Sequence, residues 1–282
     1  MFEKIQPKTL YIVGTPIGNL DDITFRAIEI LKSVNAIAAE DTRHTGKLLH
    51  HFQITTPQIS YHEHNKASRH QELLARLSRG DAIALVSDAG MPGISDPGYE
   101  LVALCVEKGI NVIPIPGVSA CITALAASGL PTDRFVFEGF LSTKNKTRNL
   151  LLEELKTESR TVILYESPHR LRRTLKDLKE TLGADRAIVI GRELTKLHEE
   201  FWRGNIGNAT IYFGGDRPLK GEFTIILGGI KASKITVMSD AEVKEELKKI
   251  MAEGISRSQA SKILANKIAL SRRHIYQLAL EI

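Results

Sequence analysis

Short runs of apolar and β-branched residues recur along the chain, with longer stretches of helical periodicity between several of them. By length and composition these runs predict strands. They are Leu10–Val13, Ala36–Ala39, Ala82–Val86, Val112–Ile115, Phe135–Phe137, Val162–Tyr165, Ala187–Ile190 and Phe223–Leu227. Ile23–Ser33 and Tyr99–Lys108 place their apolar residues on one helical face. This alternation predicts an α/β architecture whose first sheet is largely parallel.

Two places along the chain predict domain boundaries. Pro114-Ile-Pro116-Gly117 ends a strand before a helix that begins near Ser119. Gly228-Gly229 and the residues 231–240 predict a flexible joint. We therefore expect two α/β domains, at 1–116 and 117–230, followed by a third domain at 231–282.

The last 50 or so residues have helical composition and no strand signal. Ala241–Glu253 predicts one helix, and a second stretch begins at Gly254-Ile-Ser256. Ser271 begins a further helix, so the end of the chain resembles a helix–turn–helix pair. We expect a small all-α C-terminal domain.

Composition narrows the class of protein. Hydrophobic residues make up 43% and charged residues 25%, as is typical of a globular protein. Cys105 and Cys121 lie in apolar helical patterns and match no disulfide or zinc spacing, so we expect buried thiols and no metal site. No signal-peptide core opens the chain, and no window approaches the roughly 20 apolar residues of a membrane span. These features predict a cytoplasmic protein without a membrane partner.

The net charge of +5 is unevenly distributed. From Lys231 onward there are ten Lys or Arg and six Asp or Glu, whereas the first 230 residues hold 28 basic and 27 acidic residues. A basic helical tail favours an acidic partner such as nucleic acid. A solvated helix surface explains the charge equally well.

Polar loops follow the predicted strands, where a parallel sheet places its ligands. The first, Gly14–Asp22, matches neither the dinucleotide nor the P-loop fingerprint, and an ordinary strand–helix turn also explains it. The second contains Glu40, Asp41, Arg43 and His44, which provide candidates for a general base and a phosphate clamp. Ion pairing and helix capping are the structural alternative.

The third loop, Ser87–Gly98, is the richest in chemistry. Three glycines and two prolines fix a turning backbone, and Asp88 and Asp96 lie where a carboxylate can meet a cation. The alternative interpretation is a surface loop without a ligand, in which Asp96 caps the following helix. A fourth loop, Pro116–Ala120, offers free N–H groups and the Ser119 hydroxyl at a helix start, although capping alone explains Ser119.

In this order, the segments resemble the tetrapyrrole (corrin/porphyrin) methylase superfamily, and more closely its members that methylate ribosomal RNA. The match is carried by Leu10–Leu20, Ala38–Gly46, Ala84–Gly90, Ser95–Tyr99, Pro131–Phe135, Glu138–Leu141, Tyr165–Arg170 and Arg192–Lys196. The resemblance implies two α/β subdomains with S-adenosylmethionine in the cleft between them, and a homodimer. It further implies methyl transfer to the 2′-oxygen of a cytidine in the decoding region of 16S rRNA, within the small ribosomal subunit.

The resemblance also implies which residues bind the cofactor. They are Gly14, Thr15, Pro16, Asp88, Ala89, Gly90, Ile94, Ser95, Asp96, Pro97, Ser119, Ala120, Tyr165, Gly221 and Glu222. Because a ribose hydroxyl is a poor nucleophile, a base is expected beside it. The candidates are Glu40, Asp41 and His44, with Arg43 as the clamp, and the sequence does not choose among them.

Two other functions remain open from the sequence. Methylation of a tetrapyrrole would use the same fold and cofactor loops, but it would leave the basic helical tail without a purpose. A noncatalytic RNA-binding protein would explain the tail but leave the ordered loops unexplained. The identity of the methyl acceptor separates the first of these from RNA methylation, and cofactor binding separates the second.

Overall fold

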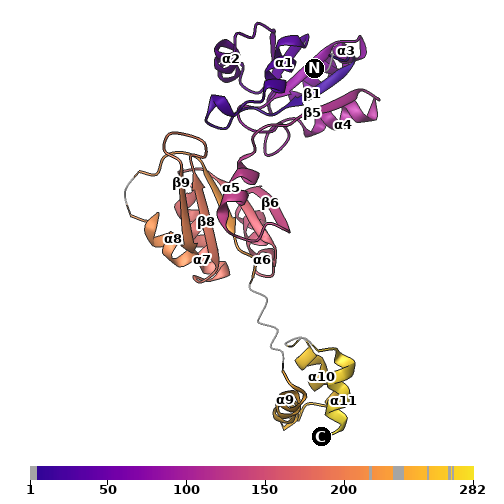
Figure 1. Ribbon diagram of the computed structural model, residues 1–282, viewed down its shortest axis with the longest axis vertical. Coiled ribbons are helices and arrows are strands. Elements are labelled where there is room, and N and C mark those ends of the chain that lie inside the picture. The colour runs from indigo at the N-terminus through magenta and orange to yellow at the C-terminus, as the bar shows by residue number, and fades with distance from the viewer. Residues whose placement is uncertain (1–4, 216–217, 231–237, 253, 266–267, 269) are drawn as a thin grey trace. The chain divides into compact units, whose positions relative to one another are not determined.

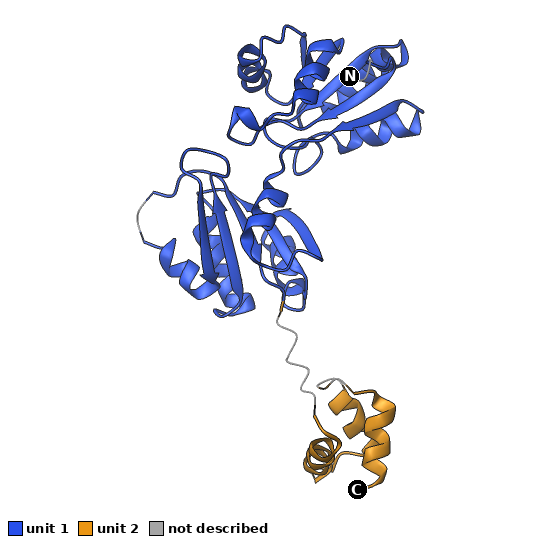
Figure 2. Cartoon of the chain, in the orientation of Figure 1, with its two compact units in different colours: residues 1–229 blue, residues 230–282 orange. Residues whose placement is uncertain are grey.

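The computed structural model describes residues 5–215, 218–230, 238–252, 254–265, 268 and 270–282 (Figure 1). The chain forms two compact units, residues 1–229 and 230–282 (Figure 2). Among the described residues, no helix is long and apolar enough to cross a membrane. Most of the joint predicted at 231–240 lies outside the described residues.

A five-stranded sheet forms the first half of the larger unit, in the order β3-β2-β4-β1-β5. Its strands are β1 (Thr9–Val13), β2 (Ala36–Ala39), β3 (Gln58–Ser60), β4 (Ala82–Val86) and β5 (Asn111–Ile115). Every neighbouring pair is parallel, which confirms the predicted direction of the strands. All strand carboxyl ends therefore lie at one edge, where ligands bind in such sheets.

Helices cover both faces of this parallel sheet, which is why its three central strands, β2, β4 and β1, are buried along their whole length. Helices α1 (Phe25–Ser33) and α2 (Thr42–His51) pack on one face. On the other lie α3 (Lys66–Ser78) and α4 (Tyr99–Glu107), the latter through Leu101 and Cys105. A short 3₁₀ helix, η1, spans Leu20–Asp22.

The second sheet is mixed, in the order β6-β7-β10-β8-β9. Its strands are β6 (Phe135–Phe140), β7 (Thr161–Glu166), β8 (Ala187–Arg192), β9 (Glu200–Asn205) and β10 (Phe223–Leu227). Only β6 and β7 pair in parallel; the other three pairs are antiparallel. The larger unit thus has the two α/β subdomains that the sequence predicts.

The two faces of the second sheet are covered differently. Helices α6 (Asn145–Glu154), α7 (Leu171–Leu182) and α8 (Ile206–Tyr212) pack on one face. Helix α5 (Ala120–Ser128) packs on the other through Cys121, Ala124 and Leu125. Ile17, from the loop after β1, joins this second cluster. A residue of the first subdomain therefore belongs to a core of the second.

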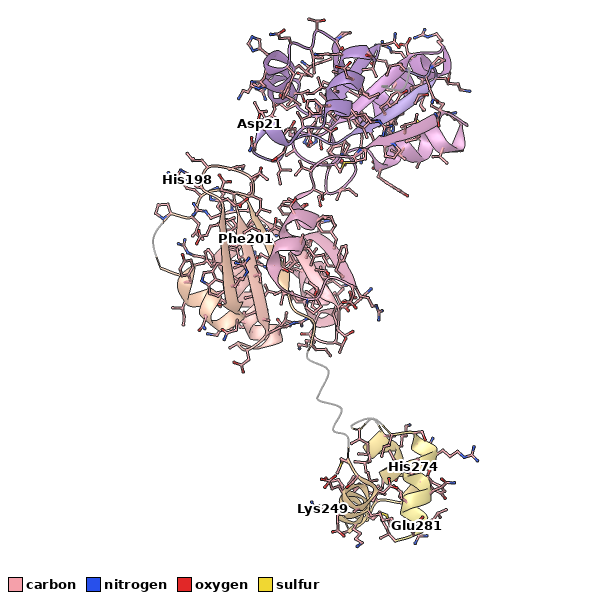
Figure 3. The ribbon with its side chains drawn as sticks, viewed as in Figure 1. Asp21, His198, Phe201, Lys249, His274 and Glu281 are labelled. Carbon is pink, nitrogen blue, oxygen red and sulfur yellow. The ribbon has the colours of Figure 1, made fainter. Side chains whose placement is uncertain are left out.

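Within its described residues, the smaller unit has the three helices that the sequence predicts: α9 (Asp240–Ala252), α10 (Arg257–Ala265) and α11 (Arg272–Leu280). Each packs against the other two around an apolar core of its own. Ser271 caps α11 by accepting the His274 N–H at 3.2 Å. A hydrogen bond between His274 and Asp240 and an ion pair between Glu281 and Lys244 join the end of the chain to α9; Figure 3 labels His274 and Glu281.

Two strands were missed by the sequence pattern, and both lie at sheet edges. Strand β3 has three residues, too few for a periodic signal. Strand β9 mixes large apolar with charged and small residues in Glu200–Asn205, because an edge strand meets solvent.

Candidate active site

The loops after β1 and β4 are joined by backbone hydrogen bonds. Thr15 N–H donates to Gly90 O at 2.9 Å, and Gly90 N–H donates to Thr15 O at 3.0 Å. The buried Thr15 hydroxyl also donates to Ser87 O, at 3.2 Å. These bonds hold both loops in one position at the carboxyl edge of the first sheet.

The loop after β2 is joined to the loop after β4 through two carboxylates. Asp88 Oδ1 accepts the Asp41 N–H at 3.0 Å, and Glu40 Oε2 lies 3.4 Å from the Asp88 N–H that donates to it. Asp88 therefore fixes the entry to α2 as well as contributing charge. Three of the four polar loops predicted from the sequence are therefore joined by hydrogen bonds.

The loops after β1 and β5 meet backbone to backbone. A Cβ atom at Gly14 would lie 2.7 Å from Gly117 Cα and 2.7 Å from Met91 Sδ, closer than such atoms approach. Only glycine allows this contact. Gly14 therefore has a packing role that brings the start of α5 beside the first loop.

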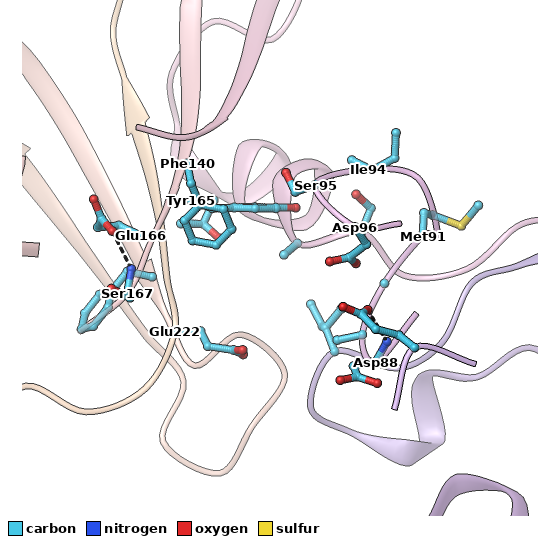
Figure 4. A pocket seen from close by; sticks show the side chains of 18 of the residues that line it. Asp88, Met91, Ile94, Ser95, Asp96, Phe140, Tyr165, Glu166, Ser167 and Glu222 are labelled. Carbon is cyan, nitrogen blue, oxygen red and sulfur yellow. Dashed lines mark hydrogen bonds between the residues drawn. The ribbon is translucent and has the colours of Figure 1, made fainter. Parts of the chain in front are cut away.

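A cavity of about 500 Å³ lies between these loops and the second sheet (Figure 4). One wall comes from the first subdomain and includes Asp88, Met91, Ile94, Ser95 and Asp96. The opposite wall comes from the second subdomain and includes Phe140, Tyr165, Glu166, Ser167 and Glu222. We call this space the first cavity.

The first cavity is acidic. Its walls include the carboxyl groups of Glu40, Asp88, Asp96 and Glu222, and of its described lining residues none carries a basic side chain. Burial, followed by repulsion from Glu40, raises the pKa of Asp96 to about 7. Burial also raises the pKa of Glu40. Such a cluster stabilises a bound cation.

Aromatic rings form the apolar part of the same cavity. The Tyr165 ring lies edge-on to Phe137 and Phe140, with centroids 4.9 and 5.7 Å away. Its hydroxyl accepts the Cys121 N–H at 3.1 Å, which holds the ring at the start of α5. A flat ligand can stack on such a rigid surface.

A second cavity, of about 590 Å³, adjoins the first. Thr15, Pro16 and Gly18 of the first loop line it, with His44 and Lys47 from the face of α2. Lys196, from the segment after β8, closes another side. Ile17, Asp88, Ala89 and Glu222 line both cavities. The two spaces therefore share a wall.

Lys196 is held by two carboxylates at this wall. Its Nζ lies 2.9 Å from Glu193 Oε1 and 2.8 Å from Glu222 Oε2. Burial disfavours the ammonium, but the two carboxylates outweigh that cost and raise the pKa of Lys196. Lys196 is therefore a fixed positive charge beside Glu222.

Most of the cofactor-binding residues predicted from the sequence lie at these cavities. The first is lined by Asp88, Ala89, Gly90, Ile94, Ser95, Asp96, Ser119, Ala120, Tyr165 and Glu222. Thr15 and Pro16 line the second. Gly14, Pro97 and Gly221 are their chain neighbours. The cofactor contacts of all these residues remain predictions.

The predicted catalytic residues do not share one cavity. Glu40 lines the first cavity and His44 the second. Asp41 caps α2 by accepting the Arg43 N–H at 2.8 Å, and it forms an ion pair with the 89% exposed Arg43 side chain. That hydrogen-bonded pairing with Arg43 lowers the pKa of Asp41, and a carboxylate with a lowered pKa is a weak base.

Sequence reasoning missed Phe140, Lys47 and Lys196. Lys196 ends the segment Arg192–Lys196, which carried part of the family resemblance but was assigned no role. Lys47 lies one helical turn after His44 in α2, so the helical period provided a signal for it. Phe140 follows a register shift in β6 that the sequence does not show.

Comparison with known proteins agrees with this architecture. Residues 9–210 match the family model of tetrapyrrole (corrin/porphyrin) methylases. The chain is 60% identical over 273 residues to the ribosomal RNA small subunit methyltransferase I of Synechocystis sp., covering 97% of this chain and 98% of that protein.

Two further comparisons bear on the units. The protein of the same name from Thermotoga maritima is 50% identical over 220 residues, which cover 98% of it but 78% of this chain. A Thermus thermophilus uroporphyrin-III C-methyltransferase structure, complexed with S-adenosylhomocysteine, matches with a TM-score of 0.53 and 21% identity, over 78% of this chain and 97% of that one. The latter likeness shows the fold.

Proposed function

Because the chain belongs to the tetrapyrrole (corrin/porphyrin) methylase family, and its relatives include proteins named ribosomal RNA small subunit methyltransferase I, we propose that it methylates small-subunit rRNA. The methyl donor is S-adenosylmethionine, and the acceptor is the ribose 2′-oxygen of a cytidine in the decoding region of 16S rRNA. One observation carries the proposal: an acidic, aromatic cavity shares a wall with a second cavity that contains lysines.

The residues of the first cavity fit S-adenosylmethionine. The ligand carries an ammonium and a sulfonium group, and the carboxylates of Asp88, Asp96 and Glu40 provide opposite charge in a partly buried space. Tyr165 and Phe140 provide aromatic surface for the adenine. The loop after β4 and the start of α5, with Ser119, would hold the methionine and ribose parts.

The second cavity is the acceptor side in this proposal. When bound, the cofactor supplies an electrophilic methyl group. The chain's own residues align the ribose oxygen with it, and alignment of this kind lowers a barrier by roughly 7–11 kcal/mol. Lys47, His44 and Lys196 offer donors to the sugar and phosphate of an RNA strand. The hydrogen-bonded loops after β1, β2 and β4 hold the walls of the two cavities in fixed positions relative to each other.

Charge in the smaller unit supports an RNA partner. On α9, Lys244, Lys248 and Lys249 each form an ion pair with a glutamate. Arg257 begins α10 and Arg273 is the second residue of α11, and neither has a carboxylate partner within the described residues. Arg272 bonds to the Ser258 hydroxyl at 3.2 Å, which brings the two helix starts together. We propose that this basic end contacts RNA phosphates.

The activity test is transfer of labelled methyl groups from S-adenosylmethionine to small ribosomal subunits that lack the modification, with a uroporphyrinogen-type substrate in parallel. We expect label at a single ribose 2′-oxygen. Label on the tetrapyrrole alone would overturn the RNA proposal but keep the donor. Binding of RNA without any methyl transfer would favour the noncatalytic function.

The RNA contact is tested by replacing Arg257, Arg272 and Arg273 with alanine. Each lost phosphate contact should reduce the salt slope of RNA binding by about 0.7, as for single strands. The matched control is alanine at Lys248 and Lys249, whose charges are paired. Equal effects in the two variants would argue against an RNA contact at the basic end.

Homodimer formation and cytoplasmic location stay predictions of the sequence, to be tested by light scattering and by cell fractionation.

A further inference from the structure

The shared wall of the two cavities restricts where methyl transfer can occur. If the donor lies in the first cavity and the acceptor in the second, the reacting atoms meet beside residues that line both. These are Ile17, Asp88, Ala89 and Glu222. Only Asp88 and Glu222 among them have ionisable side chains, so a base at the reacting oxygen is one of these two.

Asp88 is already engaged by the fold. Its Oδ1 accepts the Asp41 N–H at 3.0 Å and so fixes the loop after β2. Its own N–H points to Glu40 Oε2. Protonating this carboxylate in each turnover would weaken the contact that orients α2. Asp88 is therefore suited to a constant charge.

Glu222 has the opposite properties. Its side chain is 76% exposed, and of the described residues only Lys196 donates to its carboxylate. That bond uses Oε2, which leaves Oε1 to face an acceptor. An accessible carboxylate oxygen at the shared wall has the position that a general base needs.

The backbone around Glu222 is built to hold it in place. Glu193 N–H donates to Glu222 O at 3.0 Å, and Glu222 N–H donates to Glu193 Oε1 at 3.0 Å. Glu193 and Thr195 have positive φ angles of 50° and 64°, which side-chain-bearing residues rarely adopt. Gly221 has a φ of 94°, and a Cβ there would overlap the Glu193 side chain at 2.4 Å. Strained backbone of this kind gathers at functional sites.

We infer that Glu222 is the catalytic base for the acceptor hydroxyl, and that Lys196 is the residue that positions it. This inference rests on the proposed function and goes beyond it, because neither the sequence nor the relatives' names assign the base. Glu40 and His44 each line only one cavity, and Asp41 lines neither, so none of them lies at the shared wall.

Atoms and electrons balance in the methyl-transfer step. The ribose oxygen forms a bond to the methyl carbon as the carbon–sulfur bond breaks, and sulfur keeps that electron pair to become a neutral thioether. The hydroxyl proton passes to Glu222, which becomes a neutral carboxylic acid and later releases the proton to solvent. Lys196 stays an ammonium throughout and holds the Glu222 carboxylate by its Oε2.

The inference is tested by chemical rescue in the full-length protein. Glu222→Ala should lower the single-turnover methylation rate about 100-fold at saturating donor and rRNA, in the range of general-base catalysis. Added formate, a small carboxylate, should restore part of that rate. S-adenosylmethionine affinity, measured by calorimetry, should fall less than about tenfold, since Glu222 is exposed. The matched control is Glu180→Ala, which removes the exposed partner of Lys176 on α7.

Conservative variants separate chemistry from structure. Glu222→Gln keeps the size of the side chain and should lose the rate as Glu222→Ala does. Lys196→Arg should keep more of the rate than Lys196→Met, since it retains the positive charge beside Glu222. Because Glu222 is exposed, we expect thermal unfolding temperatures close to that of the wild type in both Glu222 variants.

The outcomes separate the inference from the proposed function. A Glu222→Ala rate within about threefold of wild type, or a loss without formate rescue, overturns the inference and leaves rRNA methylation standing. A loss in Asp88→Ala that formate rescues would assign the base to Asp88 instead. If the wild-type protein labels only the tetrapyrrole, the proposed function fails and the inference fails with it.

Discussion

The first and second cavities adjoin, yet their charges differ. Among its described lining residues, the first cavity has carboxyl groups and the Tyr165 phenol as its ionisable groups. The second cavity contains Lys47, Lys196 and His44 beside the carboxylates that the two cavities share. A cationic donor and an anionic polymer call for this division. The loops of one parallel sheet can therefore present opposite charges to two ligands when a second subdomain supplies the other walls.

Of the variants considered, Asp88→Asn should change the charge difference between the two cavities most strongly. The change removes a carboxylate from the shared wall and weakens the Asp41 N–H bond, since hydrogen bonds to charged groups contribute about 1.5–3 kcal/mol. We expect S-adenosylmethionine affinity to fall roughly 10- to 100-fold by calorimetry, in line with that energy. Unchanged affinity would remove Asp88 from the donor site.

Tyr165→Ala should reduce binding of the donor in the first cavity without affecting the second cavity. A base stacked on an aromatic ring contributes about 1–3 kcal/mol, so donor affinity should fall about tenfold. Tyr165→Phe is the control, because it keeps the ring and removes only the hydroxyl that accepts the Cys121 N–H. RNA affinity should not change in either variant. Equal losses in both would show that the hydrogen bond, rather than stacking, is what matters.

The raised pKa of Asp96 predicts that donor binding in the first cavity depends on pH. Burial raises this pKa to about 7, so the free protein holds a proton there below that pH. A bound cation favours the carboxylate and expels the proton, so donor affinity should fall about tenfold as the pH drops from about 8 to about 6. Asp96→Asn should flatten this dependence in calorimetric titrations.

The same shift predicts how stability depends on pH. A carboxyl group whose pKa is raised on folding, here from 3.8 to about 7, binds its proton more tightly in the folded state. The free energy of unfolding of the free protein should therefore decrease as the pH rises between those two values. The Asp96→Asn variant should show a smaller decrease over the same range. Thermal unfolding at about pH 5 and about pH 7, without donor, checks the direction.

The smallest expected effect is that of Lys47→Met. It removes one positive charge from the second cavity and leaves the first unchanged. The KM for rRNA should rise a few-fold, in keeping with roughly 1 kcal/mol for a partly exposed charge contact. Donor affinity should stay within error. A change in donor affinity instead would show that the cavities are not separate in function.

Much of the fold was determined by the sequence alone. The apolar runs at Leu10–Val13, Ala36–Ala39 and Ala82–Val86 are buried on both sheet faces, and so they show as continuous apolar segments. Their parallel pairing brings the loops that follow to one edge, so the apolar pattern itself predicts that Asp88 and Glu40 lie near each other. Cys105 and Cys121 are buried as their helical patterns predicted.

Only the tertiary structure decided which side chains meet across the subdomains. Lys196 follows β8 and Glu222 precedes β10, and both line the second cavity together with Asp88. Arg43 turns to solvent because Asp41 satisfies it locally. Local periodicity encodes which face of an element is buried, but it holds no information on the distance between residues as far apart in the chain as Asp88 and Glu222. That distance depends on how the two sheets pack against the shared loops.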